Sequence, residues 1–379
     1  MPYWRLSSFY FFYFAALGAL VPYWGLYLQS RGFDAVAIGS LMALLMATKI
    51  IAPNVWGWLG DHLGHRMLIV RLASLVTVLA FVNMFWAEGF WGIALVMLGY
   101  SFFWNASLPQ LEVVTLTYLG DQAKRYSLLR LWGSVGFIFT VIMLGILLDY
   151  QGTEVILWVV LAMYLGIFLV SLSVADPAPT PHPSTQGSIF QVLKQPSIVA
   201  FFVAVFLMQA GHGPYYAFYS IYLQDFGYTK GTIGLLWGLG VLAEVLLFLF
   251  MYRLLKHLNA NRILVISLLL AALRWLLIGY FPDFLWVLLF AQLLHAATFG
   301  SFHAAAIHLV QHYFKGRHKG RGQALYASMS FGAGGAVGSL SSGFMWQHWG
   351  PALTYTMAAA VALLGALVAW RYIDSAYDH

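Results

Sequence analysis

The chain has 379 residues, of which 61% are hydrophobic and 8% are charged, whereas charged residues make up about 25% of an ordinary soluble domain. A soluble protein of this length could not cover its surface with so few charges, so the composition predicts an all-α integral membrane protein. The absence of cysteine excludes disulfides, thiol catalysis and thiolate metal sites. The formal net charge of +6 comes from short loops rather than from one face, which argues against a nucleic-acid partner.

Apolar segments long enough to cross a bilayer predict twelve membrane-spanning helices in two sets of six. The first set is expected at about 6–28, 37–59, 67–87, 90–118, 124–148 and 153–174. The second set is expected at about 197–223, 231–255, 262–281, 284–313, 321–346 and 351–372. The Pro-rich polar run 176–187 cannot continue a helix and predicts a linker between the sets. We therefore expect an N-terminal six-helix bundle at 1–174, a cytoplasmic linker at 175–195 and a C-terminal six-helix bundle at 196–379.

The positions of lysine and arginine predict the orientation of these spans. Twelve spans place both termini on the same side of the membrane, and positive residues concentrate in loops that stay in the cytoplasm. Basic residues gather at the termini and the even-numbered loops, whereas the odd-numbered loops hold only Arg31 and Lys230. Both termini and the linker are therefore expected in the cytoplasm.

The two sets of spans repeat one another in sequence. YLQSRGF at 27–33 matches YLQDFGY at 222–228, and in both sets an Ile-Gly pair follows five residues later. Arg125–Gly136 matches Arg321–Gly332 at nearly the same offset. Two parallel repeats related by an axis along the membrane normal predict a cavity between the halves, near the bilayer midplane.

The stretch 101–137 consists of two apolar arms joined by the charged turn Gly120–Arg125. Glu112 lies on the first arm and Arg130 on the second. If both arms are helices, these charges stand at the same level, about 10–12 Å from the turn. Because an isolated charge is costly in an apolar medium, this pair predicts a functional site. An ion pair that only fixes the hairpin is the structural alternative.

The loop between the second and third spans reads GWLGDHLGHR at 57–66. Its glycines permit a tight turn, and Asp61 can pair with an arginine or with a neighbouring helix N-terminus. The run resembles the signature of the major facilitator superfamily, with Gly57, Asp61, Gly64 and Arg66 at the matching positions. We interpret Asp61 and Arg66 as gating and structural residues that do not contact substrate.

Further charges lie near the middle of predicted spans, where each is a candidate functional residue. Lys49 and Glu244 occupy the same repeat position, each about 18 Å from its cytoplasmic turn. Arg274 and His295 lie at depths that allow contact between neighbouring antiparallel spans.

Three other histidines lie well inside predicted spans. His212 falls where Gly and Pro interrupt a span, and we expect either a substrate-facing or a structural role. We interpret His303 and His308 as polar packing residues. No metal site is expected from these spacings.

A more detailed resemblance is to the lactose permease-like branch of the superfamily. Glu112, with Arg130 opening an RLWGSVGF run eighteen residues later, matches the substrate-binding pair of that branch. The resemblance implies that Phe137 stacks on the substrate. It also maps the branch's eighth-helix Glu, ninth-helix Arg and tenth-helix His onto a proton-coupling set, Glu244, Arg274 and His295. The branch's proton-carrying Glu is here Thr298, so the proton site does not carry over whole.

The sequence is also similar, over its full length, to the 3-phenylpropionate permease group. The matching runs include QAGHGPYY at 209–216, LWGLGVLAEV at 236–245 and LHAATF at 294–299. The intramembrane charges support an anionic substrate, because three cations against two carboxylates leave a surplus of +1. These are Lys49, Arg130 and Arg274 against Glu112 and Glu244. Arg130, helped by Lys49 or Arg274, is expected to bind the substrate carboxylate.

We therefore expect a permease that carries an aromatic monocarboxylate with a proton by alternating access. It is expected to act as a monomer in the bacterial inner membrane, in contact with lipid, with the proton as coupling ion and no other cofactor. A proton symporter of a sugar or nucleoside is the alternative. A membrane sensor that transports nothing is a remote alternative, and no catalytic residues of an enzyme are expected.

Overall fold

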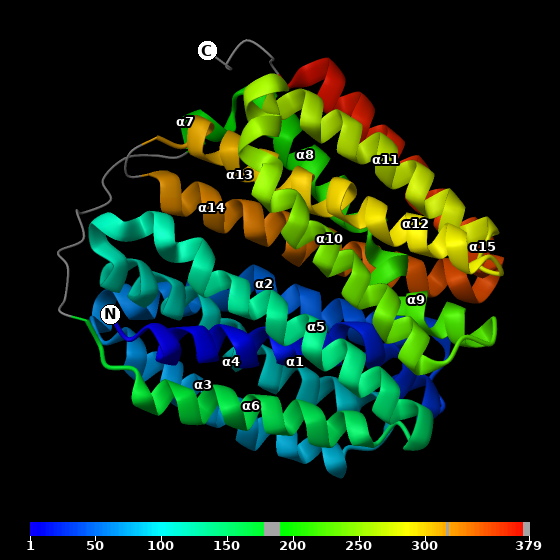
Figure 1. Cartoon of the computed structure of the whole chain (residues 1–379), viewed down its shortest axis with the longest axis horizontal. Helices are drawn as coiled ribbons and strands as arrows, with labels where there is room; N and C mark the ends of the chain where they lie inside the picture. The colour runs from blue at the N-terminus through cyan, green and yellow to red at the C-terminus, as the bar shows by residue number, and fades with distance from the viewer. Residues whose placement is uncertain (178–189, 316–317, 374–379) are drawn as a thin grey trace. The chain divides into compact units, whose positions relative to one another are not determined.

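The structure is a computed structural model that describes residues 1–177, 190–315 and 318–373. Every regular element in these ranges is a helix (Figure 1). Residues 178–189, most of the expected linker, lie outside the described residues. The helices agree with the all-α membrane architecture expected from composition.

The first six long helices correspond to the first six predicted spans. They are α1 (Tyr3–Ser30), α2 (Ala35–Leu63), α3 (Arg66–Val82), α4 (Gly89–Leu119), α5 (Tyr126–Tyr150) and α6 (Val155–Ser173). The side chain of Asp34 caps α2 by accepting a hydrogen bond from Ala37 N at 2.8 Å. Gly64 ends α2 with φ +67°, a conformation that favours glycine. The charged turn Gly120–Arg125 is a short 3₁₀ segment between α4 and α5.

The second half contains more breaks than the first. Its helices are α7 (Phe190–Leu193), α8 (Pro196–Gly211), α9 (Gly213–Asp225), α10 (Lys230–His257), α11 (Ala260–Tyr280), α12 (Leu285–His295), α13 (Ser301–Tyr313), α14 (Lys319–Ala327) and α15 (Gly335–Tyr372). The seventh predicted span is α8 and α9, which meet at His212 as the Gly and Pro residues there predict. Single π-helical turns interrupt the tenth and eleventh spans, at Ala296–Gly300 and Ser328–Gly334.

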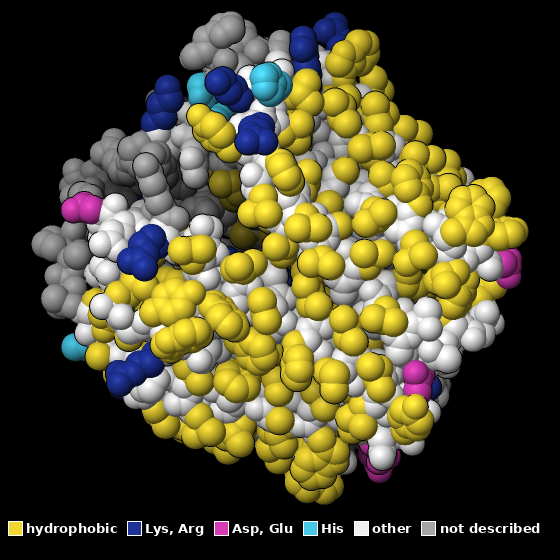
Figure 2. Space-filling model, in the orientation of Figure 1, with side chains coloured by type: hydrophobic (Ala, Val, Ile, Leu, Met, Phe, Trp, Pro, Cys, Tyr) yellow, Lys and Arg dark blue, Asp and Glu magenta, His cyan; other side chains and the backbone are white. Residues whose placement is uncertain are grey.

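Eleven helices in the described ranges are long and apolar enough to cross a membrane. The last of them, Gly320–Tyr372, has 53 residues and contains a break at Gly350, where φ is +80° and ψ is 172°, directly before Pro351. This helix therefore holds two of the predicted spans, and the expected number of twelve stands. Figure 2 shows hydrophobic side chains over most of the visible surface, with Lys and Arg side chains toward the helix ends.

Residue contacts group the chain into two compact units. The first unit contains Met1–His182 and Tyr228–Gly238, and the second contains Pro183–Gly227 and Leu239–His379. The grouping differs from the predicted halves because the first turns of α10 contact the first unit. There the Asp149 carboxylate accepts hydrogen bonds from the backbone N–H groups of Lys230 (2.7 Å) and Gly231 (3.0 Å), which caps the start of α10.

Small residues let helices approach closely in each unit. In the first unit, a Cβ on Gly18 of α1 would lie 2.7 Å from the Phe137 carbonyl oxygen of α5. In the second unit, a Cβ on Gly213 would overlap the backbone of Gly338 in α15. Close crossings of this kind are typical of helices in membranes, where dispersion replaces the hydrophobic effect as the main attraction.

Candidate functional site

Glu112 on α4 and Arg130 on α5 each have an aromatic partner in the first unit. The Tyr126 hydroxyl donates a hydrogen bond to Glu112 Oε1 at 2.9 Å. The Arg130 guanidinium lies over the ring of Phe14 from α1, 3.7 Å from its centre. Glu112 and Arg130 do not form an ion pair within the described ranges, so the alternative of a hairpin-fixing ion pair is wrong. Tyr126, one turn before Arg130 on α5, takes the place of the arginine.

Phe137 and Lys49 lie on two other helices of the same unit. Phe137 is two turns beyond Arg130 on α5, and its side chain is partly exposed. Lys49 is partly exposed on α2 and borders a cavity between α1, α2 and α4. The substrate contacts expected of both residues remain predictions.

Arg274 on α11 lies at the centre of a polar cluster in the second unit, with 0% of its surface exposed. Its Nε donates to the Ala291 carbonyl at 2.9 Å, and one Nη donates to Gln292 Oε1 at 3.2 Å. The rings of Tyr215 and Trp275 lie 4.3 and 4.8 Å from the guanidinium carbon. Because its donors and faces have these partners, Arg274 positions its neighbours in this conformation instead of presenting an open anion site.

His295 connects Arg274 to Glu244. The second Nη of Arg274 lies 3.1 Å from His295 Nδ1, so the expected contact between these residues is confirmed. A guanidinium only donates hydrogen bonds, so Nδ1 must accept, and the neutral ring carries its proton on Nε2. His295 Nε2 lies 3.7 Å from Glu244 Oε2. The cluster is therefore a chain from a fixed cation, through a neutral imidazole, to a carboxyl group that is partly exposed.

Backbone irregularities surround this chain. A π-helical turn, Ala296–Gly300, follows His295 directly, and such turns often occur at functional sites. Thr298, at the position where the resemblance to the lactose permease-like branch implies a carboxylate, is buried and donates to the His295 carbonyl at 3.3 Å. A Cβ on Gly300 would lie 2.8 Å from Glu244 Cγ, so glycine makes room for this carboxyl side chain.

The other histidines have different surroundings. His212, at the junction of α8 and α9, is 0% exposed, and its Nδ1 lies 2.8 Å from the Met208 carbonyl oxygen. Its ring packs edge-on against Trp275, which favours the structural role over the substrate-facing one in this conformation. His303 Nδ1 lies 2.8 Å from the Tyr326 hydroxyl, as expected for a packing residue. His308 is exposed, so the packing role predicted for it is wrong.

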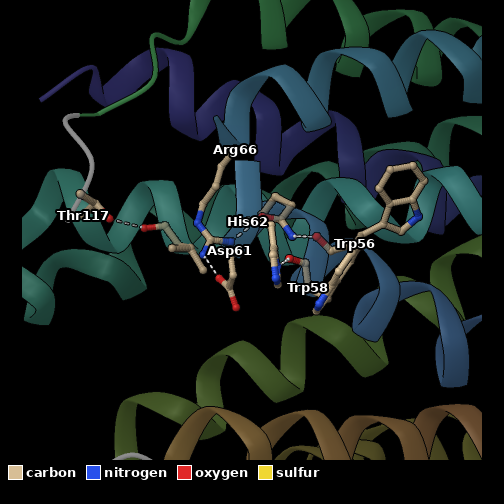
Figure 3. Close-up of polar contacts among 8 residues, drawn as sticks. Trp56, Trp58, Asp61, His62, Arg66 and Thr117 are labelled. Atoms are coloured by element: carbon tan, nitrogen blue, oxygen red, sulfur yellow. Dashed lines mark hydrogen bonds and ion pairs between the residues drawn. The ribbon is translucent and has the colours of Figure 1, made fainter. Parts of the chain in front are cut away.

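Asp61 and Arg66 form an ion pair at the turn between α2 and α3 (Figure 3). Arg66 Nη1 also donates to Gln110 Oε1 of α4 at 2.6 Å. Gln110 Nε2 in turn donates to the Trp56 carbonyl at 2.8 Å. The expected pairing of Asp61 with an arginine is therefore confirmed, and its network joins three helices. A gating role for the pair remains a prediction.

Comparison with known proteins identifies the family. Residues 3–357 match the model of the MFS_1-like family. The chain belongs to that family of the major facilitator superfamily. It is 30% identical over 364 residues to a probable 3-phenylpropionic acid transporter of Escherichia coli (strain K12), with 92% of each chain covered. It is 26% identical over 366 residues to a maltose permease of Geobacillus stearothermophilus, with 95% of this chain and 92% of the relative covered.

Solved structures of transporters share the fold of this MFS_1-like protein. A mutant of the nucleoside transporter NupG superposes with a TM-score of 0.88 at 16% identity, covering 97% of this chain and 98% of that one. A POT family transporter in complex with 5-aminolevulinic acid superposes with a TM-score of 0.76 at 11% identity, covering 97% and 94%. As a member of the MFS_1-like family, the protein is a multi-pass membrane transporter and not an enzyme.

Several contacts within this transporter's polar clusters were not predicted from the sequence. One is the hydrogen bond from Tyr126, the residue that directly follows the charged turn, to Glu112. Another is the hydrogen bond that the Tyr215 hydroxyl donates to Gln292 Oε1 at 3.0 Å. Gln292 is one turn before His295 in an apolar helix, a position whose polarity was a usable signal. Phe14 gave no such signal, because it is one of many aromatic residues in α1.

Gly60→Ala is expected to weaken the Asp61–Arg66 network of this MFS_1-like protein. An added Cβ would lie 2.5 Å from Gln110 Oε1 and 3.0 Å from Arg66 Nη1, which are held by hydrogen bonds. We expect the free energy of unfolding to fall by about 1–3 kcal/mol, the usual range for overpacking. Thermal unfolding in detergent measures the change. Gly57→Ala is the matched control, because nothing lies within 4 Å of its added Cβ. Equal stability of the two variants would contradict the prediction.

Proposed function

We propose that this transporter carries an aromatic monocarboxylate, of the 3-phenylpropionate type, together with a proton by alternating access. The observation that carries the proposal is in the first unit. Two cations within spans, Lys49 and Arg130, have no oxygen acceptor within hydrogen-bonding distance in the described part of the chain. A carboxylate supplies acceptor oxygens and the opposite charge. The relative of 30% identity, a probable 3-phenylpropionic acid transporter, supports the same class of substrate.

The proton site in this proposal is the chain of Glu244, His295 and Arg274. A partly exposed carboxyl can exchange a proton with water, whereas the buried guanidinium holds its charge. Because Arg274 fixes the tautomer of His295, the Nε2–H group faces Glu244, 3.7 Å from its Oε2. Protonation of Glu244 would therefore weaken the attraction between these two groups. The proposed proton site consists of Glu244, His295 and Arg274, and it does not need a carboxylate at position 298, which is a threonine.

We also propose where the protein works and in what oligomeric state. The basic residues of the even loops support cytoplasmic termini, and the relative from a bacterium supports the inner membrane as the location. The protein acts as a monomer in contact with lipid, with the proton as coupling ion.

Uptake of radiolabelled 3-phenylpropionate, maltose and uridine by cells that express the transporter tests the proposal. Since protonated arylalkanoic acids cross bilayers unaided, cells with an empty plasmid supply the baseline for each compound. We expect 3-phenylpropionate uptake above this baseline, removed by a protonophore, and baseline values for maltose and uridine. Absence of 3-phenylpropionate uptake above the baseline would contradict the proposed substrate.

A sugar is the second candidate substrate. The full-length similarity to a maltose permease favours it, and the Glu112–Tyr126 pair offers a carboxylate and a hydroxyl for sugar hydroxyl groups. Protonophore-sensitive accumulation of maltose, with none of 3-phenylpropionate, would establish this candidate instead.

A further inference from the structure

A cavity lies inside the first unit between α1, α2 and α4. In this conformation it has room for little more than one water molecule, and part of it is open to solvent. Its apolar wall is formed by Leu17, Leu20, Val21, Met42, Leu45 and Met46. Trp104, Asn105, Ser101 and Lys49 complete the lining, and none of these lining residues is acidic.

Two hydrogen-bond donors at this cavity have no oxygen acceptor in the part of the chain that the structure describes. Within the described residues, the hydrogen-bond partner of Lys49 Nζ is the thioether sulfur of Met46, at 3.7 Å, and a thioether is a weak acceptor. The indole Nε1–H of Trp104 is buried without a hydrogen-bond partner, in a residue that is 5% exposed. A cation and an N–H donor left without acceptors are both costly in an apolar environment.

The remaining polar residues of the lining donate their hydrogen bonds within the unit. Asn105 Nδ2 donates to Thr48 Oγ1 at 3.0 Å, and the Ser101 hydroxyl donates to the Leu98 carbonyl at 3.4 Å. The unmet requirement at the cavity is therefore for a group that accepts hydrogen bonds and carries negative charge.

We propose that this cavity, once its flexible leucine and methionine side chains move apart, is the arylalkanoate subsite, in which Lys49 and Trp104 bind the substrate carboxylate and the apolar wall holds the ring. The inference rests on the proposed function and deepens it, because it selects Lys49 rather than Arg130 as the anchor of the carboxylate. An aryl ring with a short alkyl chain suits a wall of leucine, valine and methionine side chains beside a cation. A sugar would leave its hydroxyl groups against this apolar wall without partners.

Binding by the purified protein tests the role of the Lys49 charge. We expect Lys49→Gln to weaken binding of 3-phenylpropionate by about 10- to 100-fold, the loss of one charged hydrogen bond. Lys49→Arg keeps the charge and is expected to retain most of the affinity. The neutral amide of the same acid is expected to bind the wild type and Lys49→Gln equally. Lys194→Gln removes an exposed lysine and is the matched control. Unchanged acid affinity in Lys49→Gln would overturn the inference.

Site-directed labelling tests the cavity without relying on transport. The chain has no cysteine, so Val21→Cys introduces a single thiol at the partly exposed edge of the apolar wall. We expect 3-phenylpropionate to slow its reaction with a maleimide, while 3-phenylpropanol at the same concentration slows it less. The exposed Ser173→Cys is the control and is expected to react at the same rate with and without ligand.

The two assays separate the subsite from the proposed function. If the wild type accumulates 3-phenylpropionate but Val21→Cys is not protected, the subsite is wrong and the proposed function stands. If the acid protects Val21→Cys in a protein that does not accumulate it, the subsite stands and the proposed function fails.

Discussion

Glu244→Gln is expected to abolish active accumulation of 3-phenylpropionate while leaving exchange across the membrane. The glutamine keeps the size of the side chain 3.7 Å from His295 but cannot exchange a proton. The active part of uptake is expected to fall by about 100-fold, the lower end of the range for removing a positioned proton-transfer group. Equilibrium exchange, in which labelled and unlabelled substrate swap sides without net proton movement, is expected to continue at a similar rate.

The measurement compares uptake and exchange with and without a protonophore. Glu88→Gln is the matched control, because Glu88 is an exposed carboxylate at the start of α4 without a side-chain capping bond. We expect the control to transport at the wild-type rate. Protonophore-sensitive accumulation by Glu244→Gln at the wild-type level would remove Glu244 from the mechanism.

Arg274→Met is expected to be the most destabilising change in the second unit. Methionine fills part of the space but leaves the Ala291 carbonyl, Gln292 Oε1 and His295 Nδ1 without the donor they share. Loss of buried charged hydrogen bonds of this kind costs about 3–5 kcal/mol of unfolding free energy. Arg274→Lys retains the charge with fewer contacts and is expected to lose less.

Unfolding in detergent, followed by intrinsic fluorescence during heating, measures the effect of Arg274→Met. Arg253→Met is the control, since Arg253 lies exposed near the end of α10. A melting temperature of Arg274→Met equal to that of Arg253→Met would show that the cluster does not stabilise the unit.

The architecture was largely predictable from the sequence, because span length and hydrophobicity follow directly from bilayer thickness. The break at His212 was predicted for a local reason, since Gly and Pro interrupt an α-helix there. The Arg274–His295 contact followed from the equal depth of two charged or polar residues on antiparallel spans. In each of these cases the prediction depends only on the position of a residue along its helix.

The partners of individual side chains were less predictable. Equal depth suggested that Arg130 faces Glu112, but rotation about the helix axis and side-chain reach decide the contact. Tyr126 occupies that position, and Arg130 covers Phe14 of α1. The π-helical turn after His295 and the unpaired indole N–H of Trp104 depend on how whole helices pack. A local sequence pattern does not predict that packing.

The charged residues within the predicted spans differ in whether they could bind a substrate. Arg274 is enclosed by acceptors and rings, whereas Lys49 and Arg130 are partly exposed and have no oxygen acceptor in the described ranges. The Arg274–His295–Glu244 chain ends in a carboxyl that is partly exposed. These differences underlie our proposal that the first unit recognises the anion and the second exchanges the proton.

Simultaneous recording of substrate entry and proton entry in proteoliposomes tests coupled transport most directly. Radiolabelled 3-phenylpropionate is added outside, a trapped dye reports internal pH, and protein-free liposomes supply the rate of unaided permeation. We expect the wild type to speed the entry of substrate and protons together. With Glu244→Gln, both rates are expected to equal those of protein-free liposomes. Faster substrate entry by the wild type, with proton entry no faster than in protein-free liposomes, would contradict coupled transport.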